Sequence, residues 1–214
     1  VGSVLVQWSV NGLGVNAVAA VSAAGKLSAF FASVFDALSS TMATFAGQNI
    51  GARKPERVGQ GLRAAAILGT VYCLLAFGAV MLFVRPLLGL FVDASAEAQV
   101  MEMGSYFLRV NAAFYIPLLF VNIVRLSIQG LGYTRIAMLA GLFEMAARTT
   151  VALVLVPAMG FAGACLANPT AWVAADLFLI PCYLRIMRAQ KERLFASTED
   201  DAPRRRLSRL RRSA

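Results

Sequence analysis

The stretch GQNIGARKPER, residues Gly47–Arg57, decides the fold because it is a short basic turn between two long apolar segments. The segment before it, Ala17–Asn49, carries only two charged residues, and the segment after it, Val58–Val84, carries only one. A helix needs roughly 20 apolar residues to cross the hydrocarbon core of a bilayer. We therefore expect two membrane-spanning helices that meet at this turn.

The charges of the turn indicate which side of the membrane it occupies. Arg53, Lys54 and Arg57 outnumber the one acid, Glu56, and short loops rich in Lys and Arg stay on the cytoplasmic side. We expect a cytoplasmic turn whose characteristic residues are Gln48, Asn49, Gly51 and Arg53.

The composition of the whole chain is that of an integral membrane protein. Hydrophobic residues make up 59% of it and charged residues 14%, which is more apolar than soluble domains usually are. The net charge of +9 does not indicate nucleic-acid binding, because 10 of the 20 basic residues lie in the tail between Arg185 and Arg212. The expected partner is the lipid bilayer, and no nucleic acid is expected.

Residues suited to catalysis or metal binding are scarce. Histidine is absent, which removes the commonest general base and the commonest transition-metal ligand. The cysteines are odd in number, lie in apolar segments and lack metal-ligand spacing: Cys73, Cys165 and Cys182. We expect neither a metal site nor an enzyme.

The apolar segments predict an all-α fold, a polytopic helical membrane bundle. Val1–Asn11 is about half as long as a span, and the complete spans are expected at Ala17–Asn49, Val58–Val84, Glu97–Gln129, Thr134–Val156 and Ala162–Arg188. This makes six transmembrane helices with the first truncated. The connecting loops alternate in charge, which places the C-terminus in the cytoplasm. The chain divides into a transmembrane domain, residues 1–190, and a basic cytoplasmic tail, residues 191–214, which is too polar to pack and is expected to be disordered.

Prolines inside the expected spans predict kinks, because proline lacks the N–H that the helix ladder needs. Pro117 lies within the fourth helix, and Pro169 and Pro181 lie within the sixth. Such kinks are suited to gating.

Polar residues recur at helical spacing in three of the expected helices, which places them on one face of each. The three stripes are Ser3, Gln7 and Asn11; Ser33, Asp36, Ser40, Thr44 and Gln48; and Asn111, Tyr115, Asn122 and Gln129. Small polar residues also hold membrane helices together, but three long stripes favour a hydrated cavity. The candidates for a substrate or cation pathway are Gln7, Asn11, Asp36, Ser40, Thr44, Asn111, Tyr115 and Asn122.

Charged residues inside the spans form a second set. Glu144 and Arg148 are four residues apart and are predicted to form a structural pair on one helix. Arg125 is expected to extend toward the interface or to bind backbone carbonyls. Asp36 and Asp176 have no basic residue three or four positions away, so each of them either pairs across helices, takes up a proton, or binds a cation.

These residues resemble the C-terminal six-helix lobe of the multidrug and toxic compound extrusion (MATE) family. The resemblance covers residues 1–190 and rests on four stretches: VNGLGVNAVAAVSAAGKL at 10–27, STMATFAGQNIGARKPERV at 40–58, RLSIQGLG at 125–132, and the E-x-x-x-R of Glu144 and Arg148 ahead of Pro169 and Trp172. The family builds two six-helix lobes around a central cavity. The resemblance therefore implies that an N-terminal lobe of the same transporter is missing from this chain.

The resemblance implies a secondary active transporter, a cation-coupled antiporter that exports cationic or amphipathic drugs and toxic compounds across the plasma membrane. It implies small-molecule substrates, Na⁺ or H⁺ as the coupling ion, and no other cofactor. One branch of the family uses carboxylates on the first and fourth helices of this lobe, and here the fourth has only Glu102 near its outer end. Asp36 is a possible substitute on its own chemistry. A lipid-linked saccharide flippase of the same superfamily and a membrane scaffold with a basic tail remain as alternatives.

Overall fold

The structure is a computed structural model that describes residues 2–91 and 98–210, with side chains described as far as residue 192. Within these ranges every regular element is a helix. The helices are α1 Gly2–Asn11, α2 Val15–Gly51, α3 Pro55–Leu88, α4 Ala98–Ala113, α5 Tyr115–Gly130, α6 Thr134–Thr150, the π-helix η1 Val151–Leu155, α7 Val156–Met159, α8 Phe161–Cys165 and α9 Ala167–Leu210. The predicted all-α fold is confirmed.

The described helices include the membrane-length segments that the sequence predicts. Four runs are long and apolar enough to cross a membrane, namely Val15–Gly51, Pro55–Leu88, Thr134–Met159 and Phe161–Glu192. The pair α4 and α5, bent by 54°, makes a fifth span when it is counted as one. The 10 residues of α1 are too few to cross a membrane. With the bent pair counted as one span, the described helices make one partial and five complete membrane helices, as the sequence predicts.

Three breaks in the helices each fall three residues before a proline. Phe83 inside α3 and Phe114 between α4 and α5 leave helical geometry, with φ of −120° and −110°. Leu166 between α8 and α9 keeps helical dihedral angles and forms a turn. Proline removes one hydrogen bond of the ladder, and its ring collides with the carbonyl one turn earlier. The kink predicted at Pro117 is present as the 54° bend between α4 and α5. At Pro169 a turn at Leu166 separates α8 from α9, and α9 continues through Pro181 as one helix.

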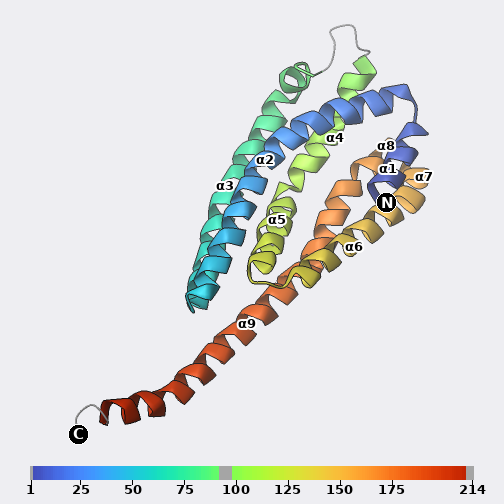
Figure 1. The fold of residues 1–214 in the computed structure, drawn as a ribbon. Coiled ribbons are helices and arrows are strands. Elements are labelled where there is room, and N and C mark those ends of the chain that lie inside the picture. Colours follow the sequence, from blue (N-terminus) through green and yellow to red (C-terminus); the bar gives the residue numbers. More distant parts are fainter. Residues whose placement is uncertain (1, 92–97, 211–214) are drawn as a thin grey trace.

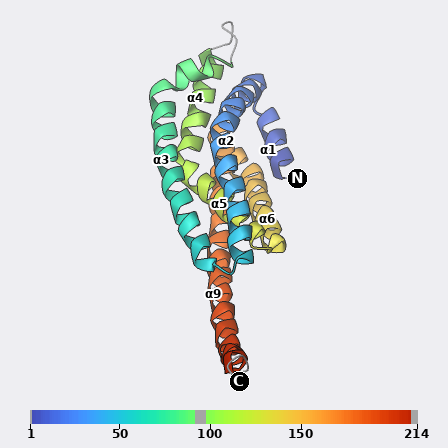
Figure 2. The same cartoon turned by 60° about the vertical axis from the view of Figure 1, so that its left-hand side comes forward.

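The helices form two groups that meet along α5 and α9 (Figures 1 and 2). In the first group α2 packs against α3, α4 and α5, and in the second α6 packs against α9 and α1. The core of the first group contains packed aromatic rings: Tyr115 contacts Phe31 of α2 in a tilted arrangement and Phe35 of α2 edge to face, with ring centroids 6.1 and 5.8 Å away. The two groups diverge on the side where α1 and the first half of α2 lie (Figure 1).

The turn between α2 and α3 is the one that the basic stretch predicts. Helix α2 ends at Gly51, and α3 begins at Pro55, which suits a first helical position because its missing N–H has no partner there. Arg53 has a φ of 58° in the left-handed region, and the Lys54 N–H donates to the Asn49 carbonyl at 2.8 Å. This closes the end of α2 and reverses the chain in three residues, Ala52 to Lys54.

The last helix differs from the expected tail. The backbone of α9 is helical to Leu210 and crosses the boundary predicted at residue 191 without a break. The segment contains Ala, Leu, Arg, Lys and Glu, which are strong helix formers. The division into a transmembrane domain and a cytoplasmic tail stays a prediction.

Candidate transport face

The stripe on α2 is an uncovered face within the described part of the chain. Its five members are all exposed: Ser33, Asp36, Ser40, Thr44 and Gln48. The opposite side of the same helix is buried against the first group, at Phe31, Phe35, Met42 and Ala46. Asp36 is the acidic residue of α2. The five residues of the stripe therefore share an exposed side of α2, and their role in a pathway stays a prediction.

Two of the three hydroxyl groups of this stripe are bound within their own helix. Ser33 Oγ donates to the Phe30 carbonyl at 2.7 Å, and Thr44 Oγ1 donates to the Ser40 carbonyl at 3.3 Å. The carboxylate of Asp36 makes no hydrogen bond or ion pair with a side chain that the structure describes, Lys26 included. Asp36 is the charged group of the stripe, and its carboxylate is open to an external ligand.

The stripe on α1 is exposed as well. Ser3, Gln7 and Asn11 lie outside the core, and Gln7 Nε2 donates to Asn11 Oδ1 at 3.0 Å. Ser3 and Gln7 line a cavity of about 190 Å³ that also touches α6 and α9. Two of the three predicted stripes thus belong to surfaces that this chain leaves open.

The third stripe differs from its prediction. Asn111 and Tyr115 are only 1% and 2% exposed, so they belong to the packed core and do not line an open face. Asn111 donates to the Phe107 carbonyl at 2.9 Å and accepts from Asn168 at 3.2 Å. Tyr115 is held against the rings of α2. Spacing along a helix defines a face, but it does not tell whether that face meets another helix or water.

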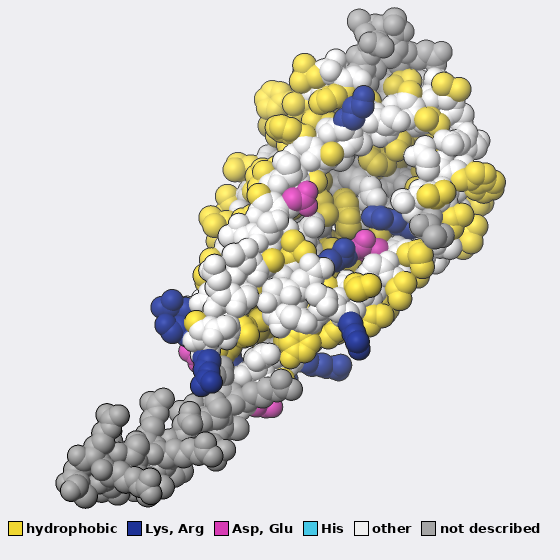
Figure 3. All heavy atoms as spheres, in the orientation of Figure 1, with side chains coloured by type: hydrophobic (Ala, Val, Ile, Leu, Met, Phe, Trp, Pro, Cys, Tyr) yellow, Lys and Arg dark blue, Asp and Glu magenta, His cyan; other side chains and the backbone are white. Residues whose placement is uncertain are grey.

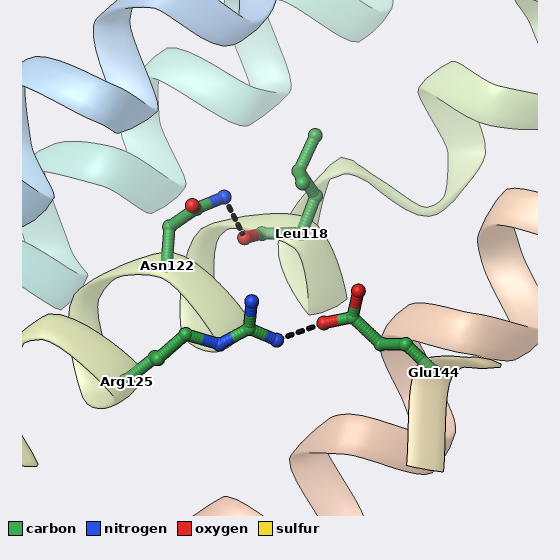
Figure 4. A network of polar contacts seen from close by, with 4 residues as sticks. All are labelled: Leu118, Asn122, Arg125 and Glu144. Carbon is green, nitrogen blue, oxygen red and sulfur yellow. Dashed lines mark hydrogen bonds and ion pairs between the residues drawn. The ribbon is translucent and has the colours of Figure 1, made fainter. Parts of the chain in front are cut away.

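Asn122 and Gln129 are half-buried. Asn122 Nδ2 donates to the Leu118 carbonyl at 2.9 Å, and its side chain lies one turn from Arg125 on α5 (Figure 4). Of the four residues in the third stripe, Asn122 is the one that lies beside the charged groups of this region.

The charged pair inside the bundle is a different one from the pair predicted. Glu144 of α6 binds Arg125 of α5, and the two side chains point toward one another across the gap between their helices (Figure 4). The predicted partner, Arg148, lies on the same face of α6 as Glu144 but makes no ion pair with a described residue. The Glu144 side chain is turned to α5, where the pair joins two helices. The expectation that Arg125 binds carbonyls or extends to the interface was also wrong.

Two further charged groups accompany this pair. Arg148 Nε and Asp176 Oδ1 are buried without a hydrogen-bond partner among the described residues. Arg125 interacts electrostatically with both of them. Figure 3 shows basic and acidic side chains within the hollow between α2 and α6. We call Arg125, Glu144, Arg148 and Asp176 the charged cluster.

Asn168 is a polar residue of this region that the sequence reasoning missed. It lines the same cavity as Ser3 and Gln7 and binds Asn111. The sequence feature that could have identified it is an amide side chain directly before Pro169 within an apolar segment. In the structure this position follows the break between α8 and α9. A break of this kind frees backbone groups and brings polar side chains to the gap.

A bundle of membrane-length helices with an open polar face and charges at membrane depth defines a polytopic membrane protein of the transporter class. The MatE family model matches residues 1–165 of the chain. The chain belongs to this family, which confirms the resemblance read from the sequence, and members of the family are membrane transporters.

Similar proteins agree with this assignment. A protein of Shewanella oneidensis named "FAD transporter" is 35% identical over 103 residues, which is 48% of this chain and 22% of that protein. A multidrug resistance MATE family transporter of the MOP superfamily, solved in an inward-facing conformation, has a TM-score of 0.76 at 20% identity and matches 84% of this chain. A MOP superfamily transporter from Pyrococcus furiosus has a TM-score of 0.72 at 21% identity. The chain spans 39–40% of these two solved transporters, and at such identities they show the fold alone.

Proposed function

We propose that this chain is one lobe of a cation-coupled antiporter that exports cationic or amphipathic organic compounds across the plasma membrane. The observation that carries the proposal is the exposed α2 stripe with the free carboxylate of Asp36. We place the turn at Ala52–Lys54 and the C-terminus on the cytoplasmic side of the membrane, because both segments are rich in basic residues.

The cost of polar groups in lipid supports this reading. Charged side chains inside membrane proteins face a bundle interior or a water-filled cavity, because hydrocarbon does not solvate them. The α2 stripe and the α1 stripe are exposed on this chain, and the matched part of the chain covers 40% of the solved transporter with the inward-facing conformation. A second lobe would cover these stripes, and transporters built from two repeats bind substrate at the interface between them.

Asp36 supplies the chemistry of exchange. A carboxylate without an ion-pair partner at membrane depth is neutralised when it binds a proton, Na⁺ or a cationic substrate. Because one charge is compensated by one ligand at a time, the coupling ion and the substrate exclude each other at this group. Such competition is what an antiporter needs.

The similarity to the FAD transporter of Shewanella oneidensis favours a second candidate substrate, an anionic flavin dinucleotide. No feature of the described residues favours the saccharide flippase or the scaffold over transport of small molecules.

The test is efflux from proteoliposomes that contain the complete transporter of which this chain is a part. We expect export of ethidium driven by an inward gradient of H⁺ or Na⁺, and we expect Asp36→Asn to reduce the rate about tenfold or more, as loss of one charged interaction does. The matched control is Glu56→Gln, an exposed acid in the first turn of α3, which should transport like the unmodified protein. Ion-independent efflux, or an Asp36→Asn rate equal to that of the control, would refute the proposal, and gradient-driven export of FAD without ethidium export would select the second substrate.

A further inference from the structure

The cavity between α1, α6, α8 and α9 has a lining that the proposed function does not explain. Its volume is about 190 Å³, and its polar side chains are Ser3, Gln7, Arg148 and Asn168. The walls are apolar, formed by Val6, Val10, Val21, Phe107, Ala164 and Ala167. No carboxylate belongs to the described lining.

Arg148 is the charged group of this cavity, and its charge is not compensated in the way that the charge of Arg125 is. Arg125 has Glu144 as its ion-pair partner. Arg148 is half-buried, its Nε is fully buried without a hydrogen-bond partner, and it forms no ion pair with a described residue. A buried guanidinium N–H that lacks a partner is costly, since buried polar groups are normally hydrogen-bonded.

The other polar groups of the cavity complement an anion. A guanidinium presents N–H donors in a fork that fits carboxylate and phosphate oxygens, and hydroxyl and amide groups add further donors. Gln7 Nε2 donates to Asn11 and Asn168 Nδ2 donates to Asn111, and each of these amide groups keeps a second N–H. The Ser3 hydroxyl and these two N–H groups are the donors that accompany Arg148 in the lining. Apolar walls around such donors strengthen the interaction by lowering the local dielectric constant.

The size of the cavity limits what enters it. Pockets for whole drug-sized ligands are roughly 300–1,000 Å³, so about 190 Å³ suits one charged group with a ring or a short chain. The remainder of a larger compound would extend from the cavity along the exposed α1 stripe.

We propose that the cavity at Arg148 binds the oxyanion, carboxylate or phosphate, of a transported amphipathic compound. This inference deepens the proposed function: the binding site is argued from the cavity, and only the transport of the bound compound rests on the proposed function. It adds a substrate class, compounds with an acidic group, to the cationic class that Asp36 favours. An anionic lipid headgroup offers the same chemistry, and the experiment separates the two sources.

The experiment is equilibrium binding by calorimetry, on the complete transporter in nanodiscs of neutral phosphatidylcholine. The probes are benzoate and benzylamine, which share a ring and differ in the sign of the charge. We expect benzoate to bind and benzylamine not to displace it. Arg148→Gln should weaken benzoate binding about tenfold or more, because the charged hydrogen bonds are lost, and Arg148→Lys should restore part of it.

Two further variants keep the test valid if Arg148→Gln folds poorly. Ser3→Val removes an exposed hydroxyl of the lining and should weaken benzoate several-fold with Arg148 in place. Arg135→Gln removes an exposed arginine of α6 outside the lining and should bind benzoate like the unmodified protein.

Each outcome decides the proposal. Equal benzoate affinity in the Arg148→Gln and Arg135→Gln proteins, or equal binding of benzylamine, would overturn it. Loss of benzoate binding in phosphatidylglycerol nanodiscs would assign the oxyanion site to a lipid headgroup and overturn the claim of a transported compound. Binding is measured without a gradient, so an intact Arg148 site in a protein that exports nothing would refute the proposed function and leave the site standing.

Discussion

Arg125 of α5 and Glu144 of α6 form an ion pair between two helices, although Arg148 lies one turn from Glu144 on the same helix. Helix α5 packs with α2 in the first group, and α6 packs with α9 in the second. The pair therefore connects the two groups of helices. Its cost in lipid is offset because each charge has the other as its partner.

We expect Glu144→Gln to destabilise the protein, because it leaves Arg125 without its partner. The side chains are 26% and 15% exposed, so the loss should be about 2 kcal/mol, less than for a fully buried pair. The double variant Arg125→Gln with Glu144→Gln should be more stable than the Glu144→Gln protein. Thermal unfolding of the complete protein in detergent measures these stabilities. A double variant whose loss of stability equals the sum of the losses in the Arg125→Gln and Glu144→Gln proteins would contradict the ion pair.

We expect Gly130→Ala to disturb the packing of α5 on α2. A Cβ at Gly130 would overlap the backbone carbonyl of Ala43, and the Gly130 carbonyl lies 3.2 Å from the position of a Cβ at Gly47. Backbone atoms cannot rotate away as a side chain does, so the helices must separate at a cost of about 1–3 kcal/mol. The control is Gly141→Ala on α6, where nothing lies within 4 Å of the added atom. Equal melting temperatures for these two variants would show that α5 and α2 are not in close contact there.

We expect Tyr115→Phe to preserve both stability and export. The Tyr115 hydroxyl is buried without a hydrogen-bond partner among the described residues, so its removal leaves no group newly unsatisfied. Tyr115→Ala, in contrast, should cost about 3 kcal/mol because it empties the site beside Phe31 and Phe35. A loss of export in a stable Tyr115→Phe protein would contradict this prediction and would show that the Tyr115 hydroxyl takes part in transport.

Much of the fold could be predicted from the sequence because lipid imposes strong constraints on it. Apolar length gives the spans, and the basic stretch at Gly47–Arg57 gives the turn between α2 and α3. Pro117 and Pro169 predict two of the breaks, since the loss of a ladder hydrogen bond is local. The break at Phe83, ahead of Pro86, follows the same rule near the end of α3.

The site was less predictable because its geometry depends on contacts between helices. The spacing of Glu144 and Arg148 describes neighbours on one helix, and it carries no information about Arg125, which is 19 residues from Glu144. The stripe of Asn111 and Tyr115 has the same periodicity as the α2 stripe, yet α2 and α9 cover it. The stripes on α2 and α1 lie on open faces, as their spacing favours, and their role stays a proposal.

The central claim is that a transport route follows the α2 stripe, and its most direct test is whether water reaches this stripe in the complete transporter. Single cysteines would be placed in a cysteine-free protein at Ser40 of the stripe, at Ser39, which is 1% exposed, and at Leu75 of α3, which is 69% exposed on the apolar surface. A membrane-impermeant maleimide reacts with the thiolate, which forms in water and not in hydrocarbon or a packed core. We predict that Ser40→Cys reacts at least about tenfold faster than Leu75→Cys and Ser39→Cys, in inside-out and right-side-out vesicles taken together. A Ser40→Cys protein that reacts no faster than Leu75→Cys in either orientation would contradict a transport route along α2.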